Sequence, residues 1–293
     1  MLFIKSNRPI VAFFLFCIAL AKPVWAEQCY HPGSWFIPDK KQYIDEPQAI
    51  EQLNASKLIL LGEHHGNEQH HQWHQSVIEQ LTINDNRWQI GLEVFPRSRQ
   101  KILDRWINKE IDEADFIKQL EWDEAWSFPY EYYRPIFLLA REKSLPLIAL
   151  NVDRSLIRKT GKLGWENIPT EEREGISDPA APSRAYIKRL AISFQRHNTQ
   201  PIGDTQKQQF RRFIQQQLLW DRAMAEGIDE ARKKHPDRRM ISIIGSWHLI
   251  AKEGVPSQLE ALNNPDYFIA IPWDDHLMCD EVSDHFADVL YSP

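Results

Sequence analysis

Five short segments rich in Ile, Leu and Val set the fold of this chain more firmly than any other part of its sequence. They cover residues 57–62, 89–94, 147–150, 240–245 and 267–271. Apolar runs of this length without polar alternation are typical of strands buried on both faces of a parallel sheet. Helical periodicity separates them, over residues 70–81, 97–107, 112–120, 132–142 and 206–231. The alternation predicts an α/β fold, a mainly parallel sheet flanked by helices on both faces, with a helical insertion over residues 154–201 beside the site.

The N-terminal residues have the pattern of a signal peptide. Lys5 and Arg8 precede an apolar run over residues 9–21, and Val24-Trp25-Ala26 supplies the small or apolar residues that a signal peptidase reads. An uncleaved membrane anchor is the alternative. Cys17 lies inside the apolar run and does not follow small residues, so lipoprotein anchoring is not expected. We expect a signal peptide over residues 1–26 and a single α/β domain over residues 27–293, periplasmic or secreted.

Charge and cysteine content fit an exported protein that does not bind nucleic acid. Cleavage would remove three basic residues and no acidic ones, which takes the formal net charge from −6 to −9. Nucleic acid is therefore not an expected partner. The mature chain would keep only Cys29 and Cys279. Such a pair in an oxidising compartment predicts a disulfide, and a redox or metal-binding thiol pair is the alternative.

Polar residues lie at the carboxyl ends of four predicted strands. These segments are Gly62-Glu63-His64-His65, Glu93, Asn151 and Gly245-Ser246-Trp247-His248. The carboxyl ends of parallel strands meet at one edge of a sheet, where ligands bind. We therefore expect Glu63, His65, Glu93 and His248 to meet in one pocket at that edge.

Glu63 and Glu93 need a partner, because burying an unpaired carboxylate is costly. One interpretation is a salt bridge to an arginine, for which the candidates are Arg97, Arg134 and Arg154. The other is a divalent metal site or a general acid–base site, made by both carboxylates with His65 and His248.

Five of the 11 histidines lie within residues 64–74, namely His64, His65, His70, His71 and His74. Imidazoles can bind a transition metal or haem iron, and they can move a proton near neutral pH. In a helix over residues 70–81, His70 and His74 share a face, while His71 points toward the sheet. His65 and His71 are the stronger candidates, and His64 and His74 are interpreted as capping or core residues.

An aromatic run of the kind that can hold a flat apolar ligand follows, made by Trp122, Trp126, Phe128, Tyr130, Tyr132 and Tyr133. Core packing is the favoured interpretation for most of these side chains. For Tyr130 and Tyr133, core packing and haem ligation are both retained as interpretations, because a tyrosinate can be an axial ligand of haem.

Together these segments resemble the ChaN-like family of haem-binding uptake proteins, over about residues 57–272. The resemblance rests on Gly62-Glu63-x-His65-x-Asn67-x-x-His70-His71, Gly91-Leu92-Glu93-Val94-Phe95, Tyr133-Arg134-Pro135-Ile136, Asn151, Trp220-Asp221-x-x-Met224-Ala225, Gly245-x-x-His248 and Gly254-Val255-Pro256. Two positions depart from the family pattern. Gly66 stands where members often have Asp, and Ser246-Trp247 stands where Asn-Gly is common.

The resemblance implies an envelope protein of haem and iron uptake, in which two subunits can hold a pair of haems face to face with tyrosine ligation. Other envelope haem-uptake components are then expected partners, and the expected haem contacts are Tyr130, Tyr133, His70, His71 and Asn151. The wider superfamily is similar to Tiki-type metal-dependent proteases and to erythromycin esterases. Their hydrolytic residues match Glu63, His65, Glu93 and His248, so a metal-dependent protease or esterase with a divalent metal on these four residues is the alternative function.

Overall fold

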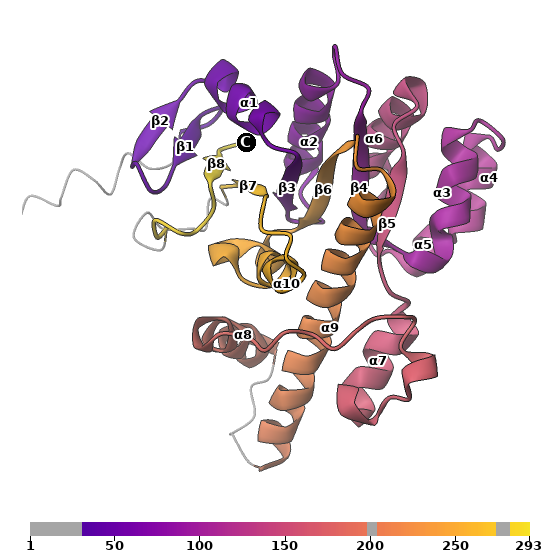
Figure 1. Cartoon of the computed structure of the whole chain (residues 1–293), viewed down its shortest axis with the longest axis vertical. Helices are drawn as coiled ribbons and strands as arrows, with labels where there is room; N and C mark the ends of the chain where they lie inside the picture. Colours follow the sequence, from indigo (N-terminus) through magenta and orange to yellow (C-terminus); the bar gives the residue numbers. More distant parts are fainter. Residues whose placement is uncertain (1–30, 198–203, 274–281) are drawn as a thin grey trace, which may run out of the picture.

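The computed structural model describes residues 31–197, 204–273 and 282–293, and its centre is an eight-stranded sheet (Figure 1). The strand order is β2-β1-β8-β7-β3-β6-β4-β5. The strands are β1 (Trp35–Ile37), β2 (Gln42–Ile44), β3 (Leu58–Glu63), β4 (Trp88–Pro96), β5 (Leu147–Asn151), β6 (Arg239–Gly245), β7 (Phe268–Pro272) and β8 (Val289–Tyr291).

The sheet is parallel from β8 to β5, and β1 and β2 add an antiparallel edge. The predicted α/β fold with a mainly parallel sheet is therefore confirmed. Each of the five predicted strands forms, with ends that differ from the prediction by at most two residues. The three-residue strands β1, β2 and β8 were not predicted, because so short a segment carries no readable periodicity.

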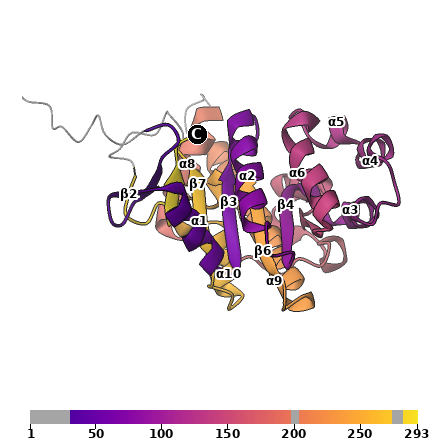
Figure 2. The same ribbon diagram turned by 90° about the horizontal axis from the view of Figure 1, so that it is seen from above.

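Helices cover both faces of the sheet (Figure 2). They are α1 (Glu46–Ala55), α2 (Glu68–Leu81), α3 (Gln100–Ile107), α4 (Glu113–Leu120), α5 (Trp122–Ala125), α6 (Tyr130–Lys143), α7 (Arg154–Leu163), α8 (Arg184–His197), α9 (Asp204–Lys234) and α10 (Val255–Ala261).

Strand β3 lies between two hydrophobic cores. Ile59 and Leu61 pack into the core beneath α2, α3 and α6, whereas Leu58 and Leu60 pack into the core beneath α9 and α10. Successive strand residues point to opposite faces, so a strand covered on both faces must be apolar throughout. This explains why β3 reads as a continuous apolar run that ends at Glu63.

The predicted helical insertion forms α7 and α8, which pack against α9 below the sheet (Figure 1). Helix α9 has 31 residues, and its length carries it from the sheet out to the insertion. Gly227 lets α9 approach β5 closely, because a Cβ at this position would lie 3.1 Å from the Leu150 Cα atom. The sheet and the insertion are therefore joined by one long helix.

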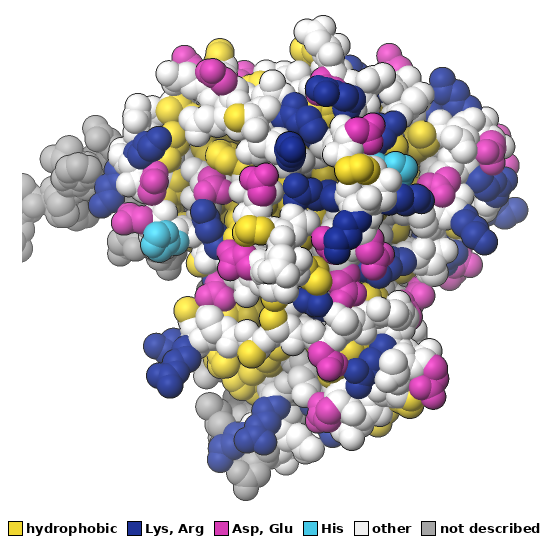
Figure 3. All heavy atoms as spheres, in the orientation of Figure 1, with side chains coloured by type: hydrophobic (Ala, Val, Ile, Leu, Met, Phe, Trp, Pro, Cys, Tyr) yellow, Lys and Arg dark blue, Asp and Glu magenta, His cyan; other side chains and the backbone are white. Residues whose placement is uncertain are grey.

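The face shown in Figure 3 carries acidic and basic side chains interspersed with one another. Within the described ranges, no helix has the length and apolar character that crossing a membrane requires. The predicted signal peptide and the predicted Cys29–Cys279 disulfide lie outside the described residues.

Candidate functional site

The carboxyl edge of the sheet is shaped by an irregularity in β4. Leu92 pairs with Ala149 and Pro96 pairs with Asn151, so three residues of β4 face one residue of β5. Such a bulge re-aims side chains next to functional sites. Here it carries Glu93, whose Oε2 atom accepts a hydrogen bond from the Gly245 amide at 2.6 Å. Asn151 supports the bulge by donating to the Glu93 carbonyl at 3.1 Å.

Glu63 and His65 form a pair at the end of β3. The Nδ1 atom of His65 lies 2.6 Å from Glu63 Oε1, and the Tyr133 hydroxyl donates to the same oxygen at 2.7 Å. Burial would raise the pKa of Glu63, but the hydrogen bond and the charge of His65 outweigh it and lower this pKa to about 2. Glu63 is therefore an anion that orients the His65 ring and leaves its Nε2 atom free to face outward.

His248 forms a second pair of the same kind. Its Nδ1 atom lies 2.6 Å from Asp221 Oδ1, and the Tyr186 hydroxyl donates to Asp221 Oδ2 at 2.5 Å. Burial would lower the pKa of His248. The negative charges of Asp221 and, to a smaller extent, Glu93 outweigh burial and raise this pKa to about 9. His248 is therefore a cation at neutral pH.

Both imidazoles approach Glu93. The distance to Glu93 Oε1 is 3.9 Å from His65 Nε2 and 3.8 Å from His248 Nε2. Gly245 makes this approach feasible, because a Cβ at this position would lie 3.2 Å from the His65 ring and 3.4 Å from Glu93 Oε2. Four residues were predicted to lie together in one pocket. Three of them, His65, Glu93 and His248, do so, and Glu63 lies behind His65.

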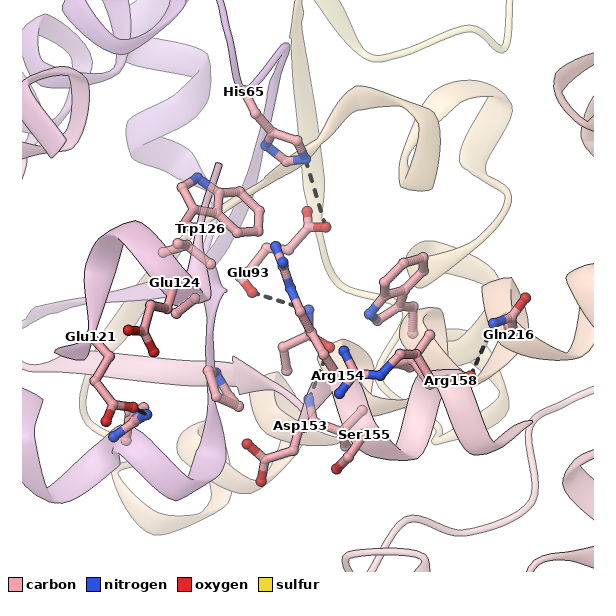
Figure 4. Close-up of a pocket in the computed structure, with 18 of the residues that line it drawn as sticks. His65, Glu93, Glu121, Glu124, Trp126, Asp153, Arg154, Ser155, Arg158 and Gln216 are labelled. Carbon is pink, nitrogen blue, oxygen red and sulfur yellow. Dashed lines mark hydrogen bonds and ion pairs between the residues drawn. The ribbon is translucent and has the colours of Figure 1, made fainter. Parts of the chain in front are cut away.

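These three side chains line an open pocket of about 790 Å³ (Figure 4). Its walls are apolar at Trp126, Phe128 and Trp220, and basic at Arg154 and Arg158. The His65 ring lies 4.9 Å from the ring of Trp126 and 5.5 Å from that of Phe128. Figure 4 shows Arg154 extending toward Glu93 beside Trp126. The pocket therefore combines flat apolar walls with arginines, with the imidazoles of His65 and His248, and with the carboxylates of Glu93, Glu121, Glu124 and Asp153.

Helix α2 places two more histidines against Glu63, on the side away from the pocket. Glu63 Oε2 lies 3.5 Å from His71 Nδ1 and 3.7 Å from His74 Nδ1. Burial lowers the pKa of His74 to about 3, so this ring is neutral. His70 instead organises the loop before α2, where its Nδ1 atom accepts the His64 backbone N–H at 2.9 Å and its Nε2 atom meets Asn67.

The two tyrosines predicted as haem ligands face carboxylates. The Tyr130 hydroxyl donates to Glu113 at 3.3 Å, and that of Tyr133 donates to Glu63. Burial and the adjacent carboxylates raise the pKa of both phenols, so both stay protonated. Neither residue lines the pocket. Both are buried side chains near the start of α6, on the face that packs into the core.

The arginines predicted to pair with Glu63 or Glu93 contact other residues instead. Arg97 donates to the Ala223 carbonyl and lies near Glu230, while Arg134 is paired with Glu113. Arg154 lies 5.7 Å from the Trp126 ring. In the part of the chain that the structure describes, no arginine forms an ion pair with Glu63 or Glu93. The salt-bridge interpretation is therefore wrong, and imidazoles take the place of the arginines.

Sequence reasoning assigned no role to two residues that belong to this site, Asp221 from α9 and Tyr186 from α8. His74 is fully buried, as the core interpretation predicted. Asp221 falls between Leu218 and Met224 on the buried stripe of α9. A carboxylate on an apolar stripe is a signal that could have identified Asp221, since such a group needs a partner.

Comparisons with known proteins identify the family and the fold of this chain. A family profile described as haem-binding uptake, Tiki superfamily, ChaN matches residues 49–259. The fold is similar to that of a solved structure described as cofacial haem binding to ChaN of Campylobacter jejuni, with a TM-score of 0.69, 18% identity and coverage of 88% of this chain and 95% of that chain. A mutant of the erythromycin esterase EreC in its open conformation gives a TM-score of 0.48 and 15% identity, over 81% of this chain and 76% of that chain. No curated protein gives a significant match.

Proposed function

This chain belongs to the ChaN family of haem-binding uptake proteins in the Tiki superfamily, and from that membership we propose that it binds haem in the pocket at the carboxyl edge of its sheet. The single observation that supports this location is the composition of the pocket wall. A haem has a flat apolar macrocycle and two anionic propionates. The pocket offers flat apolar rings and arginine side chains in one volume of about 790 Å³.

Aromatic side chains of the pocket suit the haem macrocycle, and arginine side chains suit its propionates. Trp126 and Phe128 pack around His65, and Trp220 lies 6.2 Å from His248 on the other side. Such aromatic surfaces stack on a macrocycle. Arg154 and Arg158 form no ion pair with any residue in the described ranges, so their guanidinium groups are available for carboxylates. Haem bound here supplies its iron chemistry, and these residues hold and orient it.

His65 is the proposed iron ligand. Its Nδ1 atom is fixed on Glu63, and its side chain is 25% exposed, which leaves Nε2 facing the pocket. Although burial opposes it, Glu63 raises the pKa of His65 and Asp221 raises that of His248 to about 9, so iron must displace a proton from Nε2 of either ring. His65 is the more exposed of the two side chains, at 25% against 11% for His248. Tyr130 and Tyr133, which the family resemblance favours as ligands, would have to leave their carboxylate partners and turn out of the core. A fixed, outward-facing imidazole requires no such movement.

Haem titration of the purified protein tests both the pocket and the ligand. We expect a Soret band at one haem per chain, and a loss of affinity and a changed spectrum in His65→Ala. Tyr133→Phe and Tyr130→Phe should keep the wild-type spectrum, with Tyr132→Phe as the matched control. A tyrosinate ligand gives ferric high-spin haem. A high-spin spectrum that is lost in Tyr133→Phe and kept in His65→Ala would assign the iron to Tyr133 instead.

We also propose that this binding serves haem and iron uptake outside the cytoplasm, with haem pairs held between two copies of the chain and envelope components as partners. The signal-peptide pattern over residues 1–26 supports export. N-terminal sequencing of the expressed protein should start at Glu27. Light scattering with and without haem should show a dimer that depends on haem, and a monomer at saturating haem would contradict the pairing.

A metal-dependent hydrolase is the second candidate, because two histidines are each oriented by a buried carboxylate. In this arrangement the partner of Nδ1 fixes the ring so that Nε2 can act on a proton. Glu93 lies between the two rings, and these residues with Glu63 are the ones proposed to hold a divalent ion or activate water. A screen of ester and peptide substrates with added divalent metal should detect turnover that Glu93→Gln abolishes. Turnover unchanged in that variant would exclude this site.

A further inference from the structure

Three buried acceptor atoms face one another behind the pocket. They are Glu63 Oε2, His71 Nδ1 and His74 Nδ1. Glu63 Oε2 lies 3.5 Å from His71 Nδ1 and 3.7 Å from His74 Nδ1, and each of the three residues offers a ligand atom within 4.8 Å of the others. The three side chains are at most 2% exposed. None of the three atoms has a hydrogen-bond partner among the residues that the structure describes. Buried polar atoms are nearly always paired, so three orphans in contact need an explanation.

The opposite nitrogen of each ring fixes where the protons are. His71 Nε2 lies 3.0 Å from the His65 carbonyl, and His74 Nε2 lies 2.8 Å from the Gly62 carbonyl. A carbonyl oxygen only accepts, so each Nε2 atom must carry the proton and donate it. A neutral imidazole then presents a lone pair at Nδ1. Two nitrogen lone pairs and one carboxylate oxygen therefore point into the same space.

We propose that Glu63, His71 and His74 bind a divalent first-row transition metal ion at this point. Two imidazole nitrogens and one carboxylate oxygen form a donor set that such ions take in proteins. Ligand atoms about 2.1 Å from one ion in tetrahedral geometry lie about 3.4 Å apart. The measured separations of 3.5 and 3.7 Å between Glu63 Oε2 and the two Nδ1 atoms are close to this value.

The surroundings hold the three donors in position. The other oxygen of Glu63 is occupied by Tyr133 and His65, which leaves Oε2 directed at the two histidines. Both Nε2–H groups donate to backbone carbonyls, the support that metal-bound histidines usually have. The site is distinct from the haem pocket, which none of its three residues lines, and it does not depend on the proposed function. The ion would link β3 to α2 directly behind His65.

Cobalt titration of the full-length protein tests this site, after metal is removed by chelator in mild denaturant and the protein is refolded. We expect one equivalent of Co²⁺ with visible ligand-field bands from nitrogen and oxygen donors, and competition by Zn²⁺. His71→Gln and His74→Gln should each bind at least about 100-fold more weakly, because each removes a direct ligand. His64→Gln is the control from the same histidine-rich segment, because the His64 side chain is exposed and is not one of the three proposed ligands, and it should bind like the wild type.

X-ray absorption of the Zn²⁺-loaded wild-type protein keeps the test decisive if a variant does not fold. The spectrum should show two imidazole rings at about 2.0 Å. Failure of the wild-type protein to bind Co²⁺ or Zn²⁺, or a nitrogen-15 spectrum with a proton on Nδ1 of His71 or His74 in metal-treated protein, would overturn the proposal. Loss of Co²⁺ in His248→Gln with retention in His71→Gln and His74→Gln would place the ion in the pocket and overturn it as well.

Discussion

His65 and His248 occupy equivalent positions in two Gly-x-x-His segments, which begin at Gly62 and Gly245 at the ends of the neighbouring strands β3 and β6. Each ring has its Nδ1 atom on a buried carboxylate and its Nε2 atom near Glu93. The carboxylates differ in origin, since Glu63 belongs to the same segment as His65 whereas Asp221 comes from α9. Glu63 also faces α2 through its second oxygen. The same carboxylate therefore connects the pocket to the proposed metal site.

The ionisation of His248 predicts a specific dependence of stability on pH. Its pKa is raised from 6.5 to about 9 in the folded protein, so folding favours the protonated ring. This contribution is fully present below pH 6.5 and is lost as the pH rises through 9. The shift corresponds to a contribution of up to about 3 kcal/mol to the free energy of unfolding.

Urea unfolding of the wild type and of His248→Gln measures this contribution. The advantage of the wild type should be largest near pH 6 and should shrink between pH 7 and pH 10. In an Asp221→Asn background the same comparison should depend much less on pH, because the carboxylate that raises the pKa is gone. A difference that stays constant from pH 6 to pH 10 would contradict the charged His248–Asp221 pair.

At the scale of elements, the long helix α9 determines how the insertion and the sheet fit together. Its residues Met224 and Ile228 pack on the sheet, while Leu219 and Ala223 pack with α7. The same helix carries Asp221 to His248. The position of α9 over β5 therefore sets the back of the pocket.

Gly227→Ala should disturb this fit. The new Cβ would lie 3.1 Å from Leu150 Cα and 3.2 Å from its carbonyl oxygen, and both are backbone atoms that cannot move alone. We expect a loss of about 1–3 kcal/mol in the free energy of unfolding, more than the helix propensity that alanine adds.

Gly161→Ala in α7 is the matched control for that substitution. Its Cβ would meet only the side chain of Gln216, whose end can move away. Thermal unfolding should therefore show Gly161→Ala near the wild type and Gly227→Ala clearly below it. Equal melting temperatures for the two variants would mean that α9 can shift freely over β5.

The elements differ in how far the sequence could predict them. The core strands were predicted because burial on both faces leaves a continuous apolar run, as in β3. The bulge in β4 was not predicted, because it depends on the pairing register with β5, and no sequence pattern within β4 indicates it. Within the site, His65, Glu93 and His248 were predicted from strand ends. Helical spacing placed His70 and His74 on one face and His71 on another, but His71 and His74 face Glu63 together, while His70 contacts His64 and Asn67.

At the scale of the whole molecule, the two ends of the described chain meet at one edge of the sheet. Strand β8 pairs with β7 on one side and with β1 on the other. Gly33 donates to the Ser292 carbonyl at 2.7 Å, and Ser292 donates to the Ser34 carbonyl at 2.9 Å. Few hydrogen bonds hold this edge, since β1, β2 and β8 have three residues each. A covalent link between the two terminal segments would hold this edge independently of its short strands.

A Cys29–Cys279 disulfide is the predicted link. Cys29 lies two residues before the first described residue, which leads into β1. Cys279 lies between β7 and β8 in the sequence. Closing a loop of this length restricts the unfolded chain and should add several kcal/mol, up to about 5, to the free energy of unfolding. Reduction should therefore lower the melting temperature of the wild type to that of the Cys29→Ser/Cys279→Ser double variant, on which the reductant should have no effect. Thiol titration of the unfolded, unreduced protein should find neither cysteine free, and two reactive thiols in the processed chain would rule the disulfide out.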